Sequence, residues 1–175
     1  NAQPILFHRV PEANAGRDTL VCFGRFNLNA QWTMAGSRGI WQFVKGPKKP
    51  VISQPNMLNS SIIIQEAGVY VFRWLEINDN CIGSDSVIVV VRPPLSISIE
   101  GKDAICDGLQ TDLEVNATFA SYQWTTGEVT PSITVSKPGI YGVTVTDEFG
   151  CLASASKTID EEASPIVIVV HGRYH

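Results

Sequence analysis

The fold is decided by a stretch late in the chain, residues 133–146, which reads ITVSKPGIYGVTVT. On both sides of Lys137-Pro138-Gly139, apolar residues alternate with small or polar ones, which is the period-2 pattern of half-buried β-strands. Proline and glycine supply the restricted and the permissive backbone angles of a turn between them. No stretch of the sequence shows a convincing helical period. The pattern predicts an all-β fold of short strands, as in a β-sandwich.

The same landmarks occur twice along the chain in the same order. They are Cys22, Trp41, Gly68-Val69-Tyr70 and Cys81 in the first copy, and Cys106, Trp124, Gly139-Ile140-Tyr141 and Cys151 in the second. The spacing from the first cysteine to the tryptophan agrees to within one residue, and so does the spacing from the tyrosine to the second cysteine. Only the middle differs, by roughly a dozen residues. One module therefore occurs twice, with an insertion in the first copy.

A chain of 175 residues is too long for one small sandwich and suits two. We predict two immunoglobulin-like β-sandwich domains in tandem, residues 1–93 and 95–163, divided at Pro93-Pro94 and followed by a tail, 164–175. The first domain carries the inserted loop at 42–60. The expected core residues are Trp41, Tyr70, Trp74, Trp124 and Tyr141.

The four cysteines form no C-x-x-C pair, and their even number in a β-rich chain predicts disulfides and an oxidising compartment. In each copy the second cysteine follows the tyrosine by ten or more residues, which puts it near the last hairpin turn. The repeated order predicts the pairs Cys22–Cys81 and Cys106–Cys151. Each bond would stabilise its domain by roughly 4 kcal/mol.

Several classes of function are disfavoured. The net charge of −4 counts against nucleic-acid binding, and no apolar run reaches the length that spans a bilayer. The histidines, His8, His171 and His175, lie near the two ends of the chain, and no catalytic triad or metal site suggests itself. Residues 78–80, Asn-Asp-Asn, favour a turn over a calcium loop. We predict no enzyme activity, catalytic residue, metal or cofactor.

A partner surface is expected on the first domain. If Tyr70, Phe72 and Trp74 face the core, the opposite face of their strand is apolar, whereas the matching face of the second copy is polar. Clustered apolar residues on an outer face usually mark an interface. The alternative is that residues 42–60 fold back over this face. The predicted surface comprises Val69, Val71, Leu75 and Ile77.

Two further segments suggest contacts. Ile166–Val170 is β-branched and apolar throughout. It is either the first strand of a further domain or a strand that pairs with a sheet edge of another molecule, with Ile166 and Ile168 at the interface. The loop Lys45–Pro50 carries three lysines that could contact an acidic glycan or an anionic surface, but the favoured interpretation is an ordinary solvated loop.

Residues 11–22, PEANAGRDTLVC, resemble the opening of the PKD-like repeats found in secreted proteins of the Bacteroidota. The second copy is similar to the same family in residues 121–128, SYQWTTGE, and 147–151, DEFGC. The resemblance implies a location outside the outer membrane of a Gram-negative bacterium. Such repeats occur in gliding-motility adhesins, in other cargo of the type IX secretion system, and as spacers in secreted hydrolases.

Two triplets, Asp18-Thr19-Leu20 and Asp85-Ser86-Val87, resemble the O-glycosylation signal of the same bacteria, which makes Thr19 and Ser86 candidate modification sites. Our prediction is a non-enzymatic extracellular structural or adhesive module of a cell-surface protein. Its expected partners are another protein, neighbouring repeats or a glycan. The alternatives are an accessory carbohydrate-binding or spacer module of a secreted hydrolase, and a small subunit of an outer-membrane surface assembly.

Overall fold

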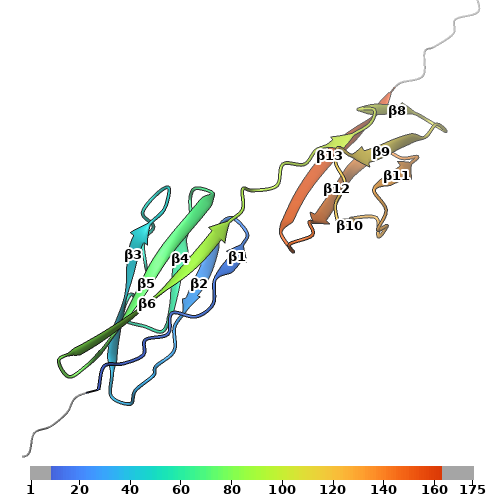
Figure 1. The fold of residues 1–175 in the computed structure, drawn as a ribbon. Helices are drawn as coiled ribbons and strands as arrows, with labels where there is room; N and C mark the ends of the chain where they lie inside the picture. The colour runs from blue at the N-terminus through green and yellow to red at the C-terminus, as the bar shows by residue number, and fades with distance from the viewer. Residues whose placement is uncertain (1–8, 163–175) are drawn as a thin grey trace, which may run out of the picture. The chain divides into compact units, whose positions relative to one another are not determined.

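The computed structural model describes residues 9–162, which form two compact units divided between Pro94 and Leu95 (Figure 1). All regular elements in this range are β-strands. The fold is thus all-β, with two immunoglobulin-like sandwiches in tandem. The tail strand with Ile166 and Ile168 lies outside the described residues, as do the three histidines.

Unit 1 is a sandwich of a four-stranded and a two-stranded sheet. The larger sheet has the order β1-β6-β5-β3 and the smaller one pairs β2 with β4. Only β1 and β6 run parallel; the other pairs are antiparallel. The strands are β1 (Thr19–Val21), β2 (Arg25–Asn29), β3 (Arg38–Lys45), β4 (Asn59–Ile63), β5 (Gly68–Asn78) and β6 (Cys81–Val91).

Unit 2 repeats this plan with one more strand in the smaller sheet. Its sheets have the orders β10-β12-β13-β8 and β11-β9-β7, and β8 runs parallel to β13 as β1 does to β6. The strands are β7 (Ile99–Glu100), β8 (Ala104–Cys106), β9 (Thr111–Val115), β10 (Ser121–Trp124), β11 (Ser132–Val135), β12 (Gly139–Thr146) and β13 (Leu152–Glu162).

Each unit buries one tryptophan at the matching place of the repeat. Trp41 and Trp124 are both 2 % exposed. An indole N–H needs a partner when it is buried. Nε1 of Trp41 donates to the Leu58 carbonyl at 3.1 Å, and Nε1 of Trp124 donates to the Thr130 carbonyl at 2.8 Å. In both units the tryptophan therefore also holds the chain that leads into a strand of the smaller sheet.

Each unit also has a tyrosine whose hydroxyl donates to a carbonyl four residues upstream. The bonds are Tyr70 to Glu66 at 2.8 Å and Tyr141 to Lys137 at 2.7 Å. This is the corner that immunoglobulin-like folds place at the start of a late strand. Tyr70 is fully buried and Tyr141 partly buried. Burial raises the pKa of the Tyr70 phenol.

The last strand has a charged end. Asp160, Glu161 and Glu162 are three consecutive acidic residues, and β13 continues through them. The reason is that these residues pair in parallel with β8, so backbone hydrogen bonds extend the strand while the three charged side chains stay exposed. The sequence pattern of side chains could not reveal that pairing.

The predicted disulfide pairs are wrong, because the register of each unit separates the two cysteines. Cys22 directly follows β1, whose Val21 pairs with Val91 at the end of β6, whereas Cys81 begins that 11-residue strand. At about 3.3 Å per residue the two lie roughly 33 Å apart, whereas bonded cysteines need Cα atoms within about 7 Å.

The same separation holds in unit 2. Cys106 pairs with Glu162, the last residue of β13, and Cys151 directly precedes Leu152, its first residue. Cys22 and Cys151 are disulfide-bonded, whereas the Cys106 thiol donates weakly to Glu162 Oε2, with Sγ and oxygen 3.9 Å apart. The repeated order of landmarks locates the cysteines along the sequence. It does not reveal that a short early strand of each unit runs parallel to the last strand.

Candidate binding surfaces

The outer face of the larger sheet of unit 1 carries rows of apolar side chains. Strands β1, β6 and β5 align Leu20, Val90 and Val69 across the sheet, and Ile88 lies opposite Val71 in the next row. Leu20, Val69, Ile88 and Val90 are between 38 and 49 % exposed. Together with Val71, these four residues form one contiguous surface, which we call the apolar face.

Further along the same sheet the outer face becomes mixed. Arg73 lies between Ser86 of β6 and Gln42 of β3, which makes a polar row. Beyond it Leu75 and Ile77 are half-buried, beside Ile40 and the exposed Ile82 respectively. Of the four residues expected on the partner surface, Val69 and Val71 therefore belong to the apolar face, and Leu75 and Ile77 lie beyond a polar row.

The inserted loop of unit 1 lies against the edge of the sandwich. Ser53 N–H donates to the Ser61 carbonyl at 3.0 Å, and Trp41 N–H donates to the Pro55 carbonyl at 2.7 Å. The loop thus bonds to β3 of one sheet and β4 of the other. Those bonds link the two sheets at one edge. The loop does not cover Val69 on the outer face, since this residue keeps 49 % of its surface exposed.

The matching face of unit 2 is polar. Two apolar residues of this face, Ile140 (the repeat equivalent of Val69) and Leu152, are 73 and 67 % exposed, but they lie toward opposite ends of the β12–β13 pair. The residues between them are small or carry hydroxyls. Thr144 and Ser154 share a hydrogen bond of 2.9 Å between their hydroxyl oxygens. Exposed serine and threonine on a sheet are typical of a solvated surface.

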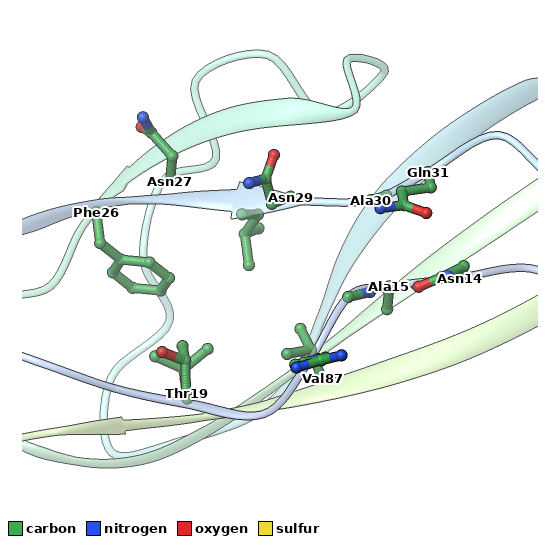
Figure 2. A pocket seen from close by; sticks show the side chains of 13 residues that line it. Asn14, Ala15, Thr19, Phe26, Asn27, Asn29, Ala30, Gln31 and Val87 are labelled. Carbon is green, nitrogen blue, oxygen red and sulfur yellow. Dashed lines mark hydrogen bonds between the residues drawn. The ribbon is translucent and has the colours of Figure 1, made fainter.

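A groove of about 620 Å³ opens at the edge of unit 1, between β2 and the chain that leads into β1. Figure 2 shows Phe26 pointing from β2 toward the segment with Thr19, with Val87 beside it at the floor. At one end the backbone carbonyl of Asn14 accepts from Gln31 N–H at 3.0 Å and closes the groove. Amide side chains dominate the rim, so hydrogen bonding is the chemistry that it offers.

Unit 2 has a hollow of about 570 Å³ beside Gly101 and Lys102. Its lining includes the exposed Asp112 and Thr134 of the smaller sheet and no residue of β13, whereas the groove of unit 1 includes Val87 and Val89 of β6. The two hollows therefore lie at different places of the repeat.

Two aspartates fasten the crossing in unit 1. Asp18 accepts from Ile88 N–H at 2.8 Å, and Asp85 accepts from Ala15 N–H at 2.8 Å. Their neighbours Thr19 and Ser86, the candidate glycosylation sites, are exposed. The aspartates therefore have a structural role, and modification of the hydroxyls stays a prediction.

The sequence reading missed Glu76, a carboxylate with no exposed surface. Its oxygens accept from the backbone N–H groups of Thr33 and Met34 at 3.0–3.2 Å and from the Thr33 hydroxyl at 2.9 Å. Glu76 continues the series of inward residues Tyr70, Phe72 and Trp74. A charged residue at a position that the alternation assigns to the core could have pointed to it in the sequence. The residue fastens the loop that precedes β3.

Two observations concern residues 9–162 as a whole. Within this range no three histidine, cysteine or acidic residues are grouped as a metal site would require. The range also contains no helix that could cross a membrane. Lys45, the last residue of β3, and Lys48 and Lys49 in the loop after it are exposed, and their contact with a glycan stays a prediction.

No family model and no curated protein matches this chain. Among solved structures, it is similar to the PKD domain of the KIAA 1837 protein, with 20 % identity and a TM-score of 0.43 over 52 % of this chain and 98 % of that one. A PKD domain of human KIAA0319 gives 18 % identity and a TM-score of 0.43, over 55 % and 96 %. The titin domains Z1Z2, solved in complex with telethonin, give 11 % identity and a TM-score of 0.39, over 90 % and 100 %.

Proposed function

We propose that this chain is a non-enzymatic structural or adhesive module that acts outside the cell and binds a protein partner through the apolar face of unit 1. The observation that carries the proposal is the difference between the two outer faces. Unit 1 exposes Leu20, Val69, Ile88 and Val90 together. In unit 2 the exposed apolar residues of the matching strands, Ile140 and Leu152, lie apart, with hydroxyl-bearing residues between them. Leaving such a group of apolar side chains in water is unfavourable, and contact with a partner removes this cost.

The setting that we propose is the surface of a Gram-negative bacterium of the Bacteroidota, in a gliding-motility adhesin or another substrate of type IX secretion. The resemblance of residues 11–22 and 121–128 to repeats from such proteins supports this setting. O-glycosylation of Thr19 and Ser86 fits the same setting, because both residues are exposed, on β1 and β6 respectively.

The test uses a photo-reactive benzoylphenylalanine in place of Val69, in the chain as the producing cells make it. Irradiation of whole cells should give one discrete crosslinked product that contains a second protein. The matched control carries the same group at Ile140, the equivalent residue in unit 2, and should give none. Equal crosslinking from both positions, or none from either, would show that the apolar face is not the binding surface.

A further inference from the structure

Strand β2 has a free edge, because β4 pairs with it on one side and the smaller sheet of unit 1 contains no further strand among residues 9–162. In an antiparallel pair, the backbone groups of successive residues point alternately toward the partner strand and away from it. Ala30 N–H donates to the Leu58 carbonyl at 3.1 Å, so the even-numbered residues of β2 face β4. The backbone N–H and C=O groups of Arg25 and Asn27 therefore point to the free edge.

The groove of about 620 Å³ runs along this free edge, since residues of β2 line one side of it. Figure 2 shows Phe26 on the groove side of β2, whereas the Asn27 side chain points the other way. A strand added at this edge would continue the alternation of side chains. Every second side chain of the added strand would then point toward Phe26 and Val87, between the two sheets.

Unit 2 fills part of the equivalent edge with its own chain. In unit 1 the segment that leads into β1 pairs with the smaller sheet at an isolated bridge, between Asn14 and Gln31. In unit 2 the segment that leads into β8 forms strand β7, in which Glu100 pairs with Glu114 of β9. Unit 2 therefore shows that this edge accepts an antiparallel strand, and unit 1 leaves more of it open.

The groove also differs in charge from the edge of unit 2. Among the described residues that line the groove, Arg17 is the one charged side chain, and it is exposed. The carboxylate of its neighbour Asp18 is engaged elsewhere, since it accepts from Ile88 N–H at 2.8 Å. Strand β9 of unit 2 instead exposes the acidic Asp112 and Glu114. A carboxylate is therefore favoured beside the groove of unit 1 and disfavoured at the edge of unit 2.

We propose that the groove of unit 1 binds an extended acidic segment of a partner protein, which pairs with β2 as an added strand and places a carboxylate against Arg17. The backbone hydrogen bonds of an added strand supply affinity, and the positions of its side chains supply specificity. The groove opens between the two sheets, whereas the apolar face lies on the outside of the larger sheet. Either surface can therefore bind its partner without the other.

The first test selects short random peptides, displayed on phage, for binding to the immobilised full chain. We expect the enriched sequences to share an aspartate or glutamate at one fixed position. Selection on Arg17→Glu should replace that residue by lysine or arginine. Arg38→Glu is the matched control, because it reverses an exposed arginine of β3 outside the groove, and it should enrich the same acidic sequences as the parent chain. No enrichment, or the same sequences from Arg17→Glu, would overturn the proposal.

The second test uses one enriched acidic peptide, made synthetically, on the unmodified chain. N-methylation of alternate peptide residues removes either the amides that face β2 or those that face solvent. The first set should lower the affinity about tenfold or more and the second less than about threefold, since only the first set donates to β2. Binding should also shift the amide NMR signals of Arg25 and Asn27.

Three outcomes of the second test would contradict an added strand. Equal losses from the two N-methylated sets would show that backbone pairing with β2 does not hold the peptide. Shifts confined to residues of the apolar face would place the peptide outside the groove. Hyaluronan oligosaccharides that shift the signals of Arg25 and Asn27, where no peptide does, would assign the groove to an acidic glycan.

Discussion

The two units share one frame and use it for different purposes. At equivalent places of the repeat, unit 1 has Phe72 and Trp74 in its core where unit 2 has Val143 and Val145, and all four are buried. On the other face of the same strand, Val71 matches Gly142. Unit 1 is therefore larger inside and more apolar outside. The comparison teaches that the tryptophan, the tyrosine corner and the strand order define the module, while the faces can change independently.

The largest effect that would test this frame comes from its tryptophans. Trp41→Ala and Trp124→Ala should each destabilise their own unit by about 3–5 kcal/mol, because each removes a buried ring and a hydrogen bond. Trp41 should cost more, since its ring also lies 5.3 Å from that of Trp74. Hydrogen exchange of peptides from each unit, measured by mass spectrometry in increasing urea, reports the two stabilities separately.

Trp41→Phe and Trp124→Phe are the controls, because they keep an aromatic ring and remove the N–H donor. They should recover much of the lost stability. If Trp124→Ala melted within a degree or two of the parent chain, the shared frame would not depend on this tryptophan.

The tryptophans also indicate how far the sequence could lead. Alternation in residues 68–77 and 139–146 predicted the strands and the inward residues, because side chains alternate strictly along a strand. The disulfide pairs were wrong because pairing depends on which end of a strand a cysteine occupies, and this follows from the parallel strands β1 and β8. Those three-residue strands carry too little pattern to reveal their direction.

The second comparison concerns Glu76 and its equivalent, Asp147. Glu76 reaches the backbone of Thr33 and Met34, whereas the shorter Asp147 accepts from Phe149 and Cys151 N–H inside its own hairpin at 2.9 and 2.8 Å. Glu76→Gln should destabilise unit 1 by about 1–3 kcal/mol, since an amide has one acceptor oxygen and places a donor against backbone N–H groups. The urea midpoint of the Glu76→Gln variant, compared with that of the parent chain, measures this loss.

Asp147→Asn should cost less, because Asp147 is only half-buried and one oxygen makes both of these bonds. Equal losses from the two variants would mean that the length of the side chain, and hence the loop it reaches, is unimportant. Glu76 could be suspected from sequence as a charge in an inward series, but its partners could not, since they are 42–43 residues away.

The tyrosine corners should respond to Tyr→Phe by about 1 kcal/mol each, the usual net worth of one hydrogen bond. The corner of unit 1 should also show a pH dependence. Burial raises the pKa of Tyr70 in the folded chain, so above about pH 10 the unfolded chain releases this proton first. Stability is fully present below that pH and falls as the pH rises through the raised pKa. Tyr70→Phe should flatten this fall, as monitored by thermal melting between pH 8 and 11; an unchanged slope would contradict the assignment.

The smallest effect on stability should come from the two outer faces, where the comparison is sharpest for binding. Val69→Lys and Ile140→Lys replace equivalent, exposed residues, so each should change the free energy of unfolding by no more than about 0.5 kcal/mol. The two substitutions should differ in their effects on association. Val69→Lys introduces a charge beside Val90, in the row that also holds Leu20. Any contact made by the apolar face must then bury that charge, which is strongly unfavourable without a partner. Ile140→Lys adds a charge to a sheet that already exposes hydroxyls. In a pull-down of the partner identified by crosslinking at position 69, Val69→Lys should lower recovery at least tenfold and Ile140→Lys less than twofold. Loss of the partner from both variants would assign the contact to a feature that the units share.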